Sequence, residues 1–92
     1  MKKLLDNITA EVTKAFVEAG YEEKFGKVTL SNRPDLCEFQ CNGAMAAAKQ
    51  YKKATFMIAD DVAARLQDVE MFASVESVKP GLLNLKLSEE YL

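Results

Sequence analysis

The sequence contains no histidine and only two cysteines, Cys37 and Cys41. Two thiols without histidine are too few ligands for a structural zinc site, and two cysteines are too few for a disulfide framework. In an extended segment, the C-x-x-x-C spacing would place both thiols on one face but about 13 Å apart. We therefore expect two reduced thiols and no metal site, and we do not expect a redox pair.

Long apolar runs are also missing, and no stretch approaches the length of a membrane span. The N-terminal Met1–Asn7 begins like a signal peptide, but an acid and an amide follow before an apolar core can form. We therefore expect a cytoplasmic protein with no membrane partner. The 92 residues predict a single domain with one thin core, too small for a large active-site cleft. No nucleophile, base or glycine loop accompanies Asp60, Asp61 or Glu38, so a small independent enzyme is not indicated.

The formal net charge of -2 hides an uneven distribution of charge along the chain. Residues 24–53 are mainly basic, whereas residues 54–78 are mainly acidic. The basic residues of the first segment are Lys24, Lys27, Arg33, Lys49, Lys52 and Lys53. A face that suits a polyanion and an ordinary solvated face both remain open interpretations.

Three helices are predicted from apolar residues at three- and four-residue steps. The first carries a stripe from Leu4 to Ala19 and ends at Gly20. The second covers residues 44–51, with Asn42 as its expected cap, and the third covers about 13 residues, with Thr55 as its expected cap.

Four short strands are predicted around these helices. Residues 28–31 and 36–41 can be extended on either side of an Asn32–Asp35 turn, and residues 72–78 and 82–87 form a hairpin. The predicted fold is α+β: a small antiparallel sheet of about four strands with three helices, in the order helix, strand, strand, helix, helix, strand, strand.

Three motifs occur in one order along this predicted fold. Residues 28–50 contain Ser-Asn-Arg-Pro-Asp-Leu and Phe-Gln-Cys-Asn-Gly-Ala-Met, residues 58–62 read Ile-Ala-Asp-Asp-Val, and residues 79–85 read Lys-Pro-Gly-Leu-Leu-Asn-Leu. Together with Leu-Ser-Glu-Glu-Tyr-Leu at residues 87–92, they resemble the N-terminal additional domain of bacterial-type arginyl-tRNA synthetases. The resemblance covers nearly everything from Lys27 onward.

The resemblance implies a domain that performs no chemistry. In this family the domain contacts the D-loop at the corner of the tRNA, and a base there helps to mark the arginine acceptor. Catalysis, with ATP and magnesium, belongs to the downstream part of an ATP-dependent arginine-tRNA ligase. The ATP-binding signature His-x-Gly-His requires histidine, which these residues lack, so we expect neither a catalytic residue nor a cofactor here. The expected partners are tRNA and the remainder of the synthetase, not DNA.

The C-terminal residues suggest how this domain relates to a longer chain. Ser88–Leu92 has the start signals of a helix and then stops after one turn. We therefore interpret residues 1–92 as one domain that is excised from the N-terminal part of a parent chain.

The last hairpin carries the first group of candidate tRNA-binding residues. If Leu83, Leu85 and Leu87 point inward, period-two alternation turns Leu82, Asn84 and Lys86 to the opposite face. That face would offer an apolar platform, an amide for a base edge and a cation for a phosphate. The family usually has phenylalanine where this chain has Leu82, so stacking is expected to be weaker. A solvated face without a ligand is the alternative interpretation.

A second group of candidates is basic. Lys49, Lys52 and Lys53 follow the alanine-rich second helix, and Lys79 lies in the hairpin turn. Engagement of three charges predicts a slope of log K against log salt of about -2 to -3.

Other residues received different expectations. Gln40 and Asn42 are expected to cap the second helix or bond the Asn32 turn instead of contacting RNA. The rival function is a stand-alone protein-interaction module of α+β fold. Its apolar contacts would come from Phe56, Met57, Phe72 and Tyr91.

Overall fold

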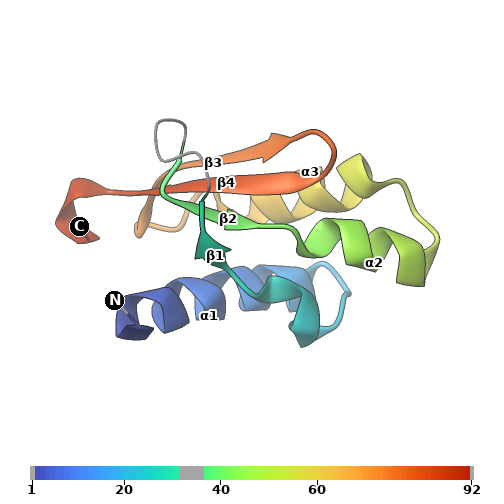
Figure 1. The fold of residues 1–92 in the computed structure, drawn as a ribbon, viewed down its shortest axis with the longest axis horizontal. Helices are drawn as coiled ribbons and strands as arrows, with labels where there is room; N and C mark the ends of the chain where they lie inside the picture. Colours follow the sequence, from blue (N-terminus) through green and yellow to red (C-terminus); the bar gives the residue numbers. More distant parts are fainter. Residues whose placement is uncertain (1, 32–36, 92) are drawn as a thin grey trace.

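The computed structural model describes residues 2–31 and 37–91, and Figure 1 shows their arrangement. The helices are α1 (Lys2–Glu18), α2 (Gly43–Tyr51) and α3 (Thr55–Leu66), with short 3-10 helices η1 (Glu23–Gly26) and η2 (Glu89–Tyr91). The strands are β1 (Thr29–Leu30), β2 (Phe39–Cys41), β3 (Phe72–Val78) and β4 (Leu82–Leu87). The predicted α+β class and order of the main elements are confirmed.

The four strands form one antiparallel sheet in the order β1-β2-β4-β3. Strand β4 therefore lies inside the sheet, although it is the last strand in the sequence. In its register with β2, Gln40 is opposite Asn84, and in its register with β3, Glu76 is opposite Asn84. These pairings bring three strands from distant parts of the chain into one continuous surface.

One core lies between the sheet and the helices. The stripe of α1 is buried at Ile8, Val12, Ala15 and Phe16, as the periodicity predicts. From β4, Leu83, Leu85 and Leu87 enter the same core, together with apolar residues of α2, α3, β2 and β3. All three helices thus share the core with one face of the sheet.

Helix α1 ends where the sequence predicts. The Gly20 amide donates to the Val17 carbonyl and the Tyr21 amide donates to the Phe16 carbonyl, with Gly20 at a φ of 99°. This is a Schellman arrangement, and glycine is favoured at its left-handed position because it has no Cβ.

Both predicted side-chain caps are wrong. Asn42 precedes α2 and Ala54 precedes α3, and neither start has a side-chain cap hydrogen bond. Thr55 is instead the first residue of α3. At the start of α2, the Met45 amide donates to the Asn42 backbone carbonyl, so the backbone partly replaces the expected side-chain bond.

The first two strands are shorter than expected, and a 3-10 helix separates α1 from β1. Strand β1 covers two residues and β2 covers three. The predicted Asn32–Asp35 turn and the first predicted residue of the second strand, Leu36, lie outside the described residues. The η1 segment has no apolar period of its own and packs beside α2, where the Phe25 carbonyl lies so close to Gly43 that a Cβ there would overlap it.

Candidate nucleic-acid interface

The side of the sheet that faces away from the core is the first candidate interface, and we call it the open face. It comprises Thr29 of β1, Gln40 of β2, Leu82, Asn84 and Lys86 of β4, and Ser74, Glu76 and Val78 of β3. None of these side chains is buried. Alternation along β4 therefore confirms that Leu82, Asn84 and Lys86 share a face opposite to the three core leucines.

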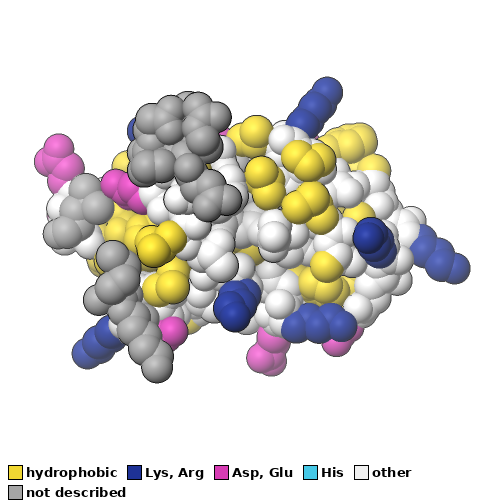
Figure 2. Space-filling view, in the orientation of Figure 1, with side chains coloured by type: hydrophobic (Ala, Val, Ile, Leu, Met, Phe, Trp, Pro, Cys, Tyr) yellow, Lys and Arg dark blue, Asp and Glu magenta, His cyan; other side chains and the backbone are white. Residues whose placement is uncertain are grey.

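The centre of the open face is polar, and its hairpin end is apolar. The Gln40 Nε2 donates a hydrogen bond of 2.9 Å to Asn84 Oδ1. Leu82 is half-buried and lies opposite Val78, which is 36% exposed. Figure 2 shows hydrophobic side chains gathered near the end of the molecule that holds the β3–β4 turn. An apolar surface and a hydrogen-bonding amide are thus adjacent on one strand.

Lys86 is exposed on the open face, but carboxylates lie near it. The Glu38 amide donates to the Leu85 carbonyl, and a Glu38 carboxylate oxygen accepts from the Leu87 amide at 2.8 Å. These two bonds join Glu38 to the residues of β4 that precede and follow Lys86. On the other neighbouring strand, Glu76 is two positions along from Ser74, which lies opposite Lys86. The open face is therefore electrically mixed, not basic.

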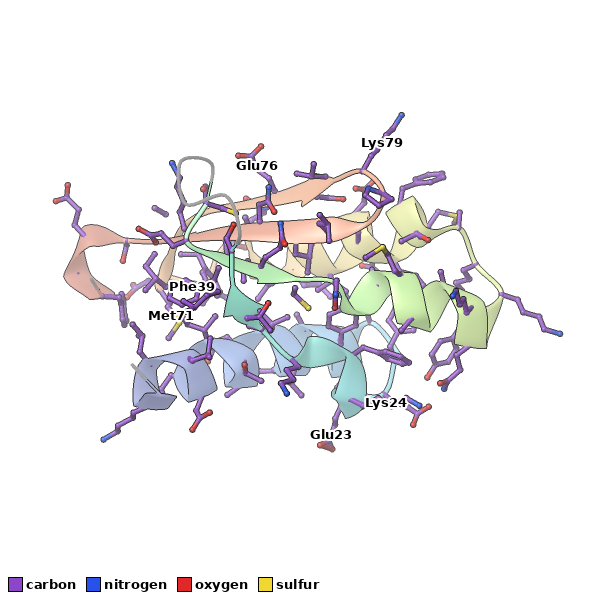
Figure 3. All side chains as sticks on the ribbon, viewed as in Figure 1. Glu23, Lys24, Phe39, Met71, Glu76 and Lys79 are labelled. Carbon is purple, nitrogen blue, oxygen red and sulfur yellow. The ribbon has the colours of Figure 1, made fainter. Side chains whose placement is uncertain are left out.

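The remaining predicted lysines lie away from Lys86. Lys79 projects from the hairpin turn (Figure 3), and all four of these lysines are exposed. Lys49, Lys52 and Lys53 lie at the C-terminal end of α2 and just after it, at the same end of the molecule as the β3–β4 turn (Figure 1). The predicted lysines thus form two groups. Lys86 lies on the open face, and the other four lie at what we call the basic end: Lys49, Lys52, Lys53 and Lys79.

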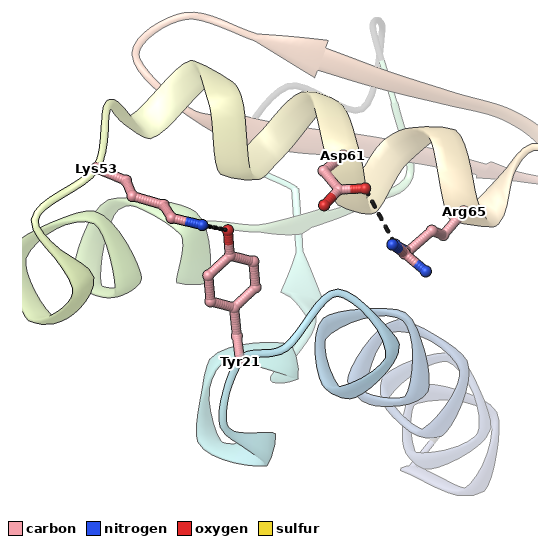
Figure 4. Close-up of polar contacts among 4 residues, drawn as sticks. All are labelled: Tyr21, Lys53, Asp61 and Arg65. Atoms are coloured by element: carbon pink, nitrogen blue, oxygen red, sulfur yellow. Dashed lines mark hydrogen bonds and ion pairs between the residues drawn. The ribbon is translucent and has the colours of Figure 1, made fainter.

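Lys53 is positioned by an aromatic residue that follows α1. Its Nζ donates a hydrogen bond of 3.1 Å to the Tyr21 hydroxyl and lies 5.1 Å from the centre of the Tyr21 ring (Figure 4). Tyr21 and Tyr51 form an edge-to-face pair with their ring centres 5.0 Å apart. These contacts hold the Lys53 ammonium near α1, so this lysine serves the packing of α2 as well as any ligand.

The two cysteines are buried, and Cys41 belongs to the core. Cys37 donates to the Ser31 hydroxyl at 3.2 Å, and Cys41 donates to the Phe25 carbonyl at 3.4 Å. Burial raises the pKa of the Cys41 thiol to about 11, and a backbone hydrogen bond from Gly43 opposes this rise. Because the thiolate is the reactive form, this thiol is suited to packing and not to nucleophilic chemistry.

The apolar residues of the rival interaction surface do not lie together. Phe56 and Met57 are 59% and 56% exposed in the first turn of α3. Phe72, however, is only 8% exposed and belongs to the core, so its predicted role as a surface contact is wrong. Tyr91 is exposed in η2, and Figure 1 places the C-terminal end of the chain opposite the end that holds the β3–β4 turn.

Phe56 borders a hollow of about 220 Å³ between α3 and the hairpin. The other lining residues are Asp60, Ser77, Val78, Lys79 and Gly81.

Within the described residues, no three potential metal-binding side chains lie together, and no helix there has the length and apolarity to cross a membrane.

Sequence reasoning missed the polar neighbours of Asn84. Gln40 was expected to cap α2 or bond the Asn32 turn. The start of α2 has no side-chain cap, the Asn32 turn lies outside the described residues, and the Gln40 amide bonds Asn84 across the sheet. Glu76 of β3 also lies directly opposite Asn84. The alternation within each strand would have identified these residues as outward-facing, but nothing local in the sequence indicates which strands pair.

Comparisons with known proteins agree on one family. A family model described as the arginyl tRNA synthetase N terminal domain matches residues 2–87. An arginine-tRNA ligase from Agathobacter rectalis is 73% identical over the whole of this chain, which spans 15% of that relative. One from Alkaliphilus oremlandii is 46% identical over the whole chain, which spans 16% of it.

A solved structure supports the fold. The crystal structure of arginyl-tRNA synthetase from Plasmodium falciparum matches 98% of this chain with a TM-score of 0.66, at 21% sequence identity, and the match covers 16% of that chain. At this identity the likeness concerns the fold alone.

Proposed function

Because the chain belongs to the arginyl-tRNA synthetase N-terminal domain family, we propose that it is a non-catalytic tRNA-binding domain of an arginine-tRNA ligase. In this proposal it contacts the D-loop at the corner of the tRNA and helps to select tRNA-Arg. The downstream part of the ligase performs the arginylation with ATP and magnesium in the cytoplasm. Residues 1–92 form one domain of that longer chain and pack against its remainder.

The observation that carries the proposal is the open face of β4. Leu82 provides apolar surface next to Asn84, whose amide can hydrogen-bond a base edge. Both side chains are half-exposed on a strand that is paired on both sides, while the alternate residues of that strand are buried in the core. A central strand that presents an apolar group beside an amide suits the recognition of a base that is turned out of a loop.

The distribution of charge favours base contact in one region and phosphate contact in another. Glu38 and Glu76 near Lys86 make the open face unfavourable for a run of phosphates, so base contact is its proposed role. Lys79 in the hairpin turn and the lysines that end α2 lie at the same end of the molecule. We assign phosphate contacts to this basic end, with Lys86 making at most one further contact.

The test is a titration of the isotope-labelled chain with a tRNA-Arg transcript, followed by the backbone amide signals in nuclear magnetic resonance spectra. Signals of residues 82–86 and of Lys49, Lys52 and Lys53 should shift, and the binding should weaken with salt. A slope of log K against log salt of about -2 to -3 is expected if about three lysines release counterions.

A matched pair of charge variants separates contact from general attraction. Lys52→Gln lies in the basic end and should reduce the magnitude of the salt slope by about 1. Lys14→Gln removes the same charge from an exposed position of α1 and should leave the slope nearly unchanged. Unchanged signals for residues 82–86 at saturating tRNA would contradict the proposed function.

A protein-interaction surface remains the second candidate because Phe56 and Met57 are exposed beside the hollow between α3 and the hairpin. Its partner in this proposal is the remainder of the synthetase. Signal shifts confined to Phe56 and Met57 on addition of that partner, with none on addition of tRNA, would favour this alternative.

A further inference from the structure

Four polar side chains form a row across the centre of the open face. Thr29, Gln40, Asn84 and Glu76 are successive cross-strand neighbours on β1, β2, β4 and β3. Figure 3 shows Glu76 projecting from β3 on the side of the strand away from α1. Because residues directly opposite each other in antiparallel strands point to the same face, their side chains lie side by side.

The bond inside this row has a direction. Gln40 Nε2 is the donor and Asn84 Oδ1 is the acceptor, 2.9 Å apart. The carbonyl end of the Asn84 amide is therefore engaged toward β2. Because Oδ1 and Nδ2 are at the two ends of one amide, the amino group Nδ2 is not the end that bonds Gln40. An amide has distinct donor and acceptor ends, so this orientation decides which chemistry the face presents.

Glu76 favours the same orientation from the other side. Its carboxylate can only accept hydrogen bonds, and it lies directly opposite Asn84 in the register of β3 and β4. A reversed Asn84 amide would turn its carbonyl oxygen toward this carboxylate, and it would keep a bond to Gln40 only if the Gln40 amide reversed as well. The Glu76 carboxylate on β3 thus favours one of the two Asn84 orientations, and the Gln40 donor on β2 matches that orientation.

We infer that Gln40 is a positioning residue that holds Asn84 with its amino group outward, so that the open face offers a hydrogen-bond donor to a looped-out base. The preferred ligand is a base edge that presents an acceptor, a ring nitrogen or a carbonyl oxygen, at that point. This inference rests on the proposed function and adds the polarity of the contact. An ordered donor binds more tightly because no orientation must be selected when the RNA arrives.

Three single variants test this polarity by measuring the affinity for a tRNA-Arg transcript. Gln40→Glu introduces an acceptor that draws the Asn84 amino group toward β2 and turns its carbonyl outward. Asn84→Asp keeps an acceptor for Gln40 but removes the outward donor. Thr29→Glu adds the same charge at an exposed position of the same row, next to Gln40 but two strands away from Asn84.

We expect Gln40→Glu and Asn84→Asp each to lower the affinity about 3- to 10-fold more than Thr29→Glu does. The side-chain amide signals of Asn84 provide a readout that a purely structural role would not move. They should shift when tRNA binds the native chain, and they should already be displaced in free Gln40→Glu. Gln50→Leu, which removes a side-chain bond to Glu22 outside the open face, serves as the control for stability.

The outcomes separate the inference from the proposed function. If tRNA shifts the Asn84 side-chain signals of the native chain but Gln40→Glu binds as Thr29→Glu does, the positioning role is wrong and the binding role stands. If tRNA leaves those signals unchanged in the native chain, both are wrong. Should Gln40→Glu fail to fold, Asn84→Asp decides: affinity equal to that of Thr29→Glu overturns the outward donor.

Discussion

The two faces of β4 make a sharp prediction, because Leu85 and Leu82 belong to the same strand but to opposite sides of it. Leu85 is 0% exposed and lies between Phe39 and Val75 of the neighbouring strands. Leu85→Ala should cost about 3 to 5 kcal/mol of unfolding free energy, since the lost transfer term and the cavity add. Leu82→Ala, on the half-exposed side, should cost about 1 kcal/mol or less.

These costs can be compared with the stability of a domain of this size. At 0.05–0.15 kcal/mol per residue, 92 residues give a total of about 5 to 14 kcal/mol. With a shift of about 4 to 8 °C per kcal/mol, Leu85→Ala should lower the melting temperature by at least about 12 °C. Urea denaturation followed by circular dichroism measures both variants on one scale.

The two alanine variants should affect tRNA binding in the reverse order of their effects on stability. At a temperature where both variants are folded, Leu82→Ala should weaken the interaction with tRNA-Arg, whereas Leu85→Ala should leave it nearly unchanged. Equal losses of stability for the two alanine variants would refute the assignment of Leu82 to an uncovered face. The proposed contact between Leu82 and a base would then be refuted as well.

Three further predictions follow from single residues. Leu82→Phe adds an aromatic face where the chain has only an aliphatic one and should tighten tRNA binding by about 1 kcal/mol, near the lower limit for base stacking, with an unchanged salt slope in titrations. Gly43→Ala should lower the unfolding free energy by about 1 to 3 kcal/mol in thermal melts, because the added Cβ meets the Phe25 carbonyl. Burial raises the pKa of the Cys41 thiol from 9.0 to about 11, so the thiol of the unfolded chain loses its proton at a lower pH than the thiol of the folded chain. The contribution of this thiol to the free energy of unfolding is therefore complete below pH 9, and roughly 2 to 3 kcal/mol should be lost as the pH rises through 11. Urea midpoints of Cys41→Ala across the same pH range should show a smaller alkaline loss.

Most of the fold could be predicted because its signals are local. The buried stripe of α1 and the alternation of β4 each depend on residues within one element, and both are confirmed. Gly20 ends α1 for an equally local reason, since its left-handed φ suits a residue without Cβ. The predicted caps at Asn42 and Thr55 failed because a capping residue type indicates only that a bond is available to the backbone.

The candidate interface could be predicted only in part. Leu82, Asn84 and Lys86 were correctly placed on one face, because parity along one strand decides that. Their surroundings were not predicted. Gln40 comes from 44 positions away to bond Asn84, and Lys53 reaches Tyr21 across 32 positions.

The sequence by itself determined which residues of each helix and strand are apolar, and therefore which side of each element must be buried. It also carried the motifs that indicate the arginyl-tRNA synthetase family. Only the tertiary structure decided that β4 lies between β2 and β3, so that Gln40 and Glu76 both adjoin Asn84. The physical reason is that burial follows from a pattern within a few residues, whereas strand pairing depends on the free energy of the whole core and of every alternative register.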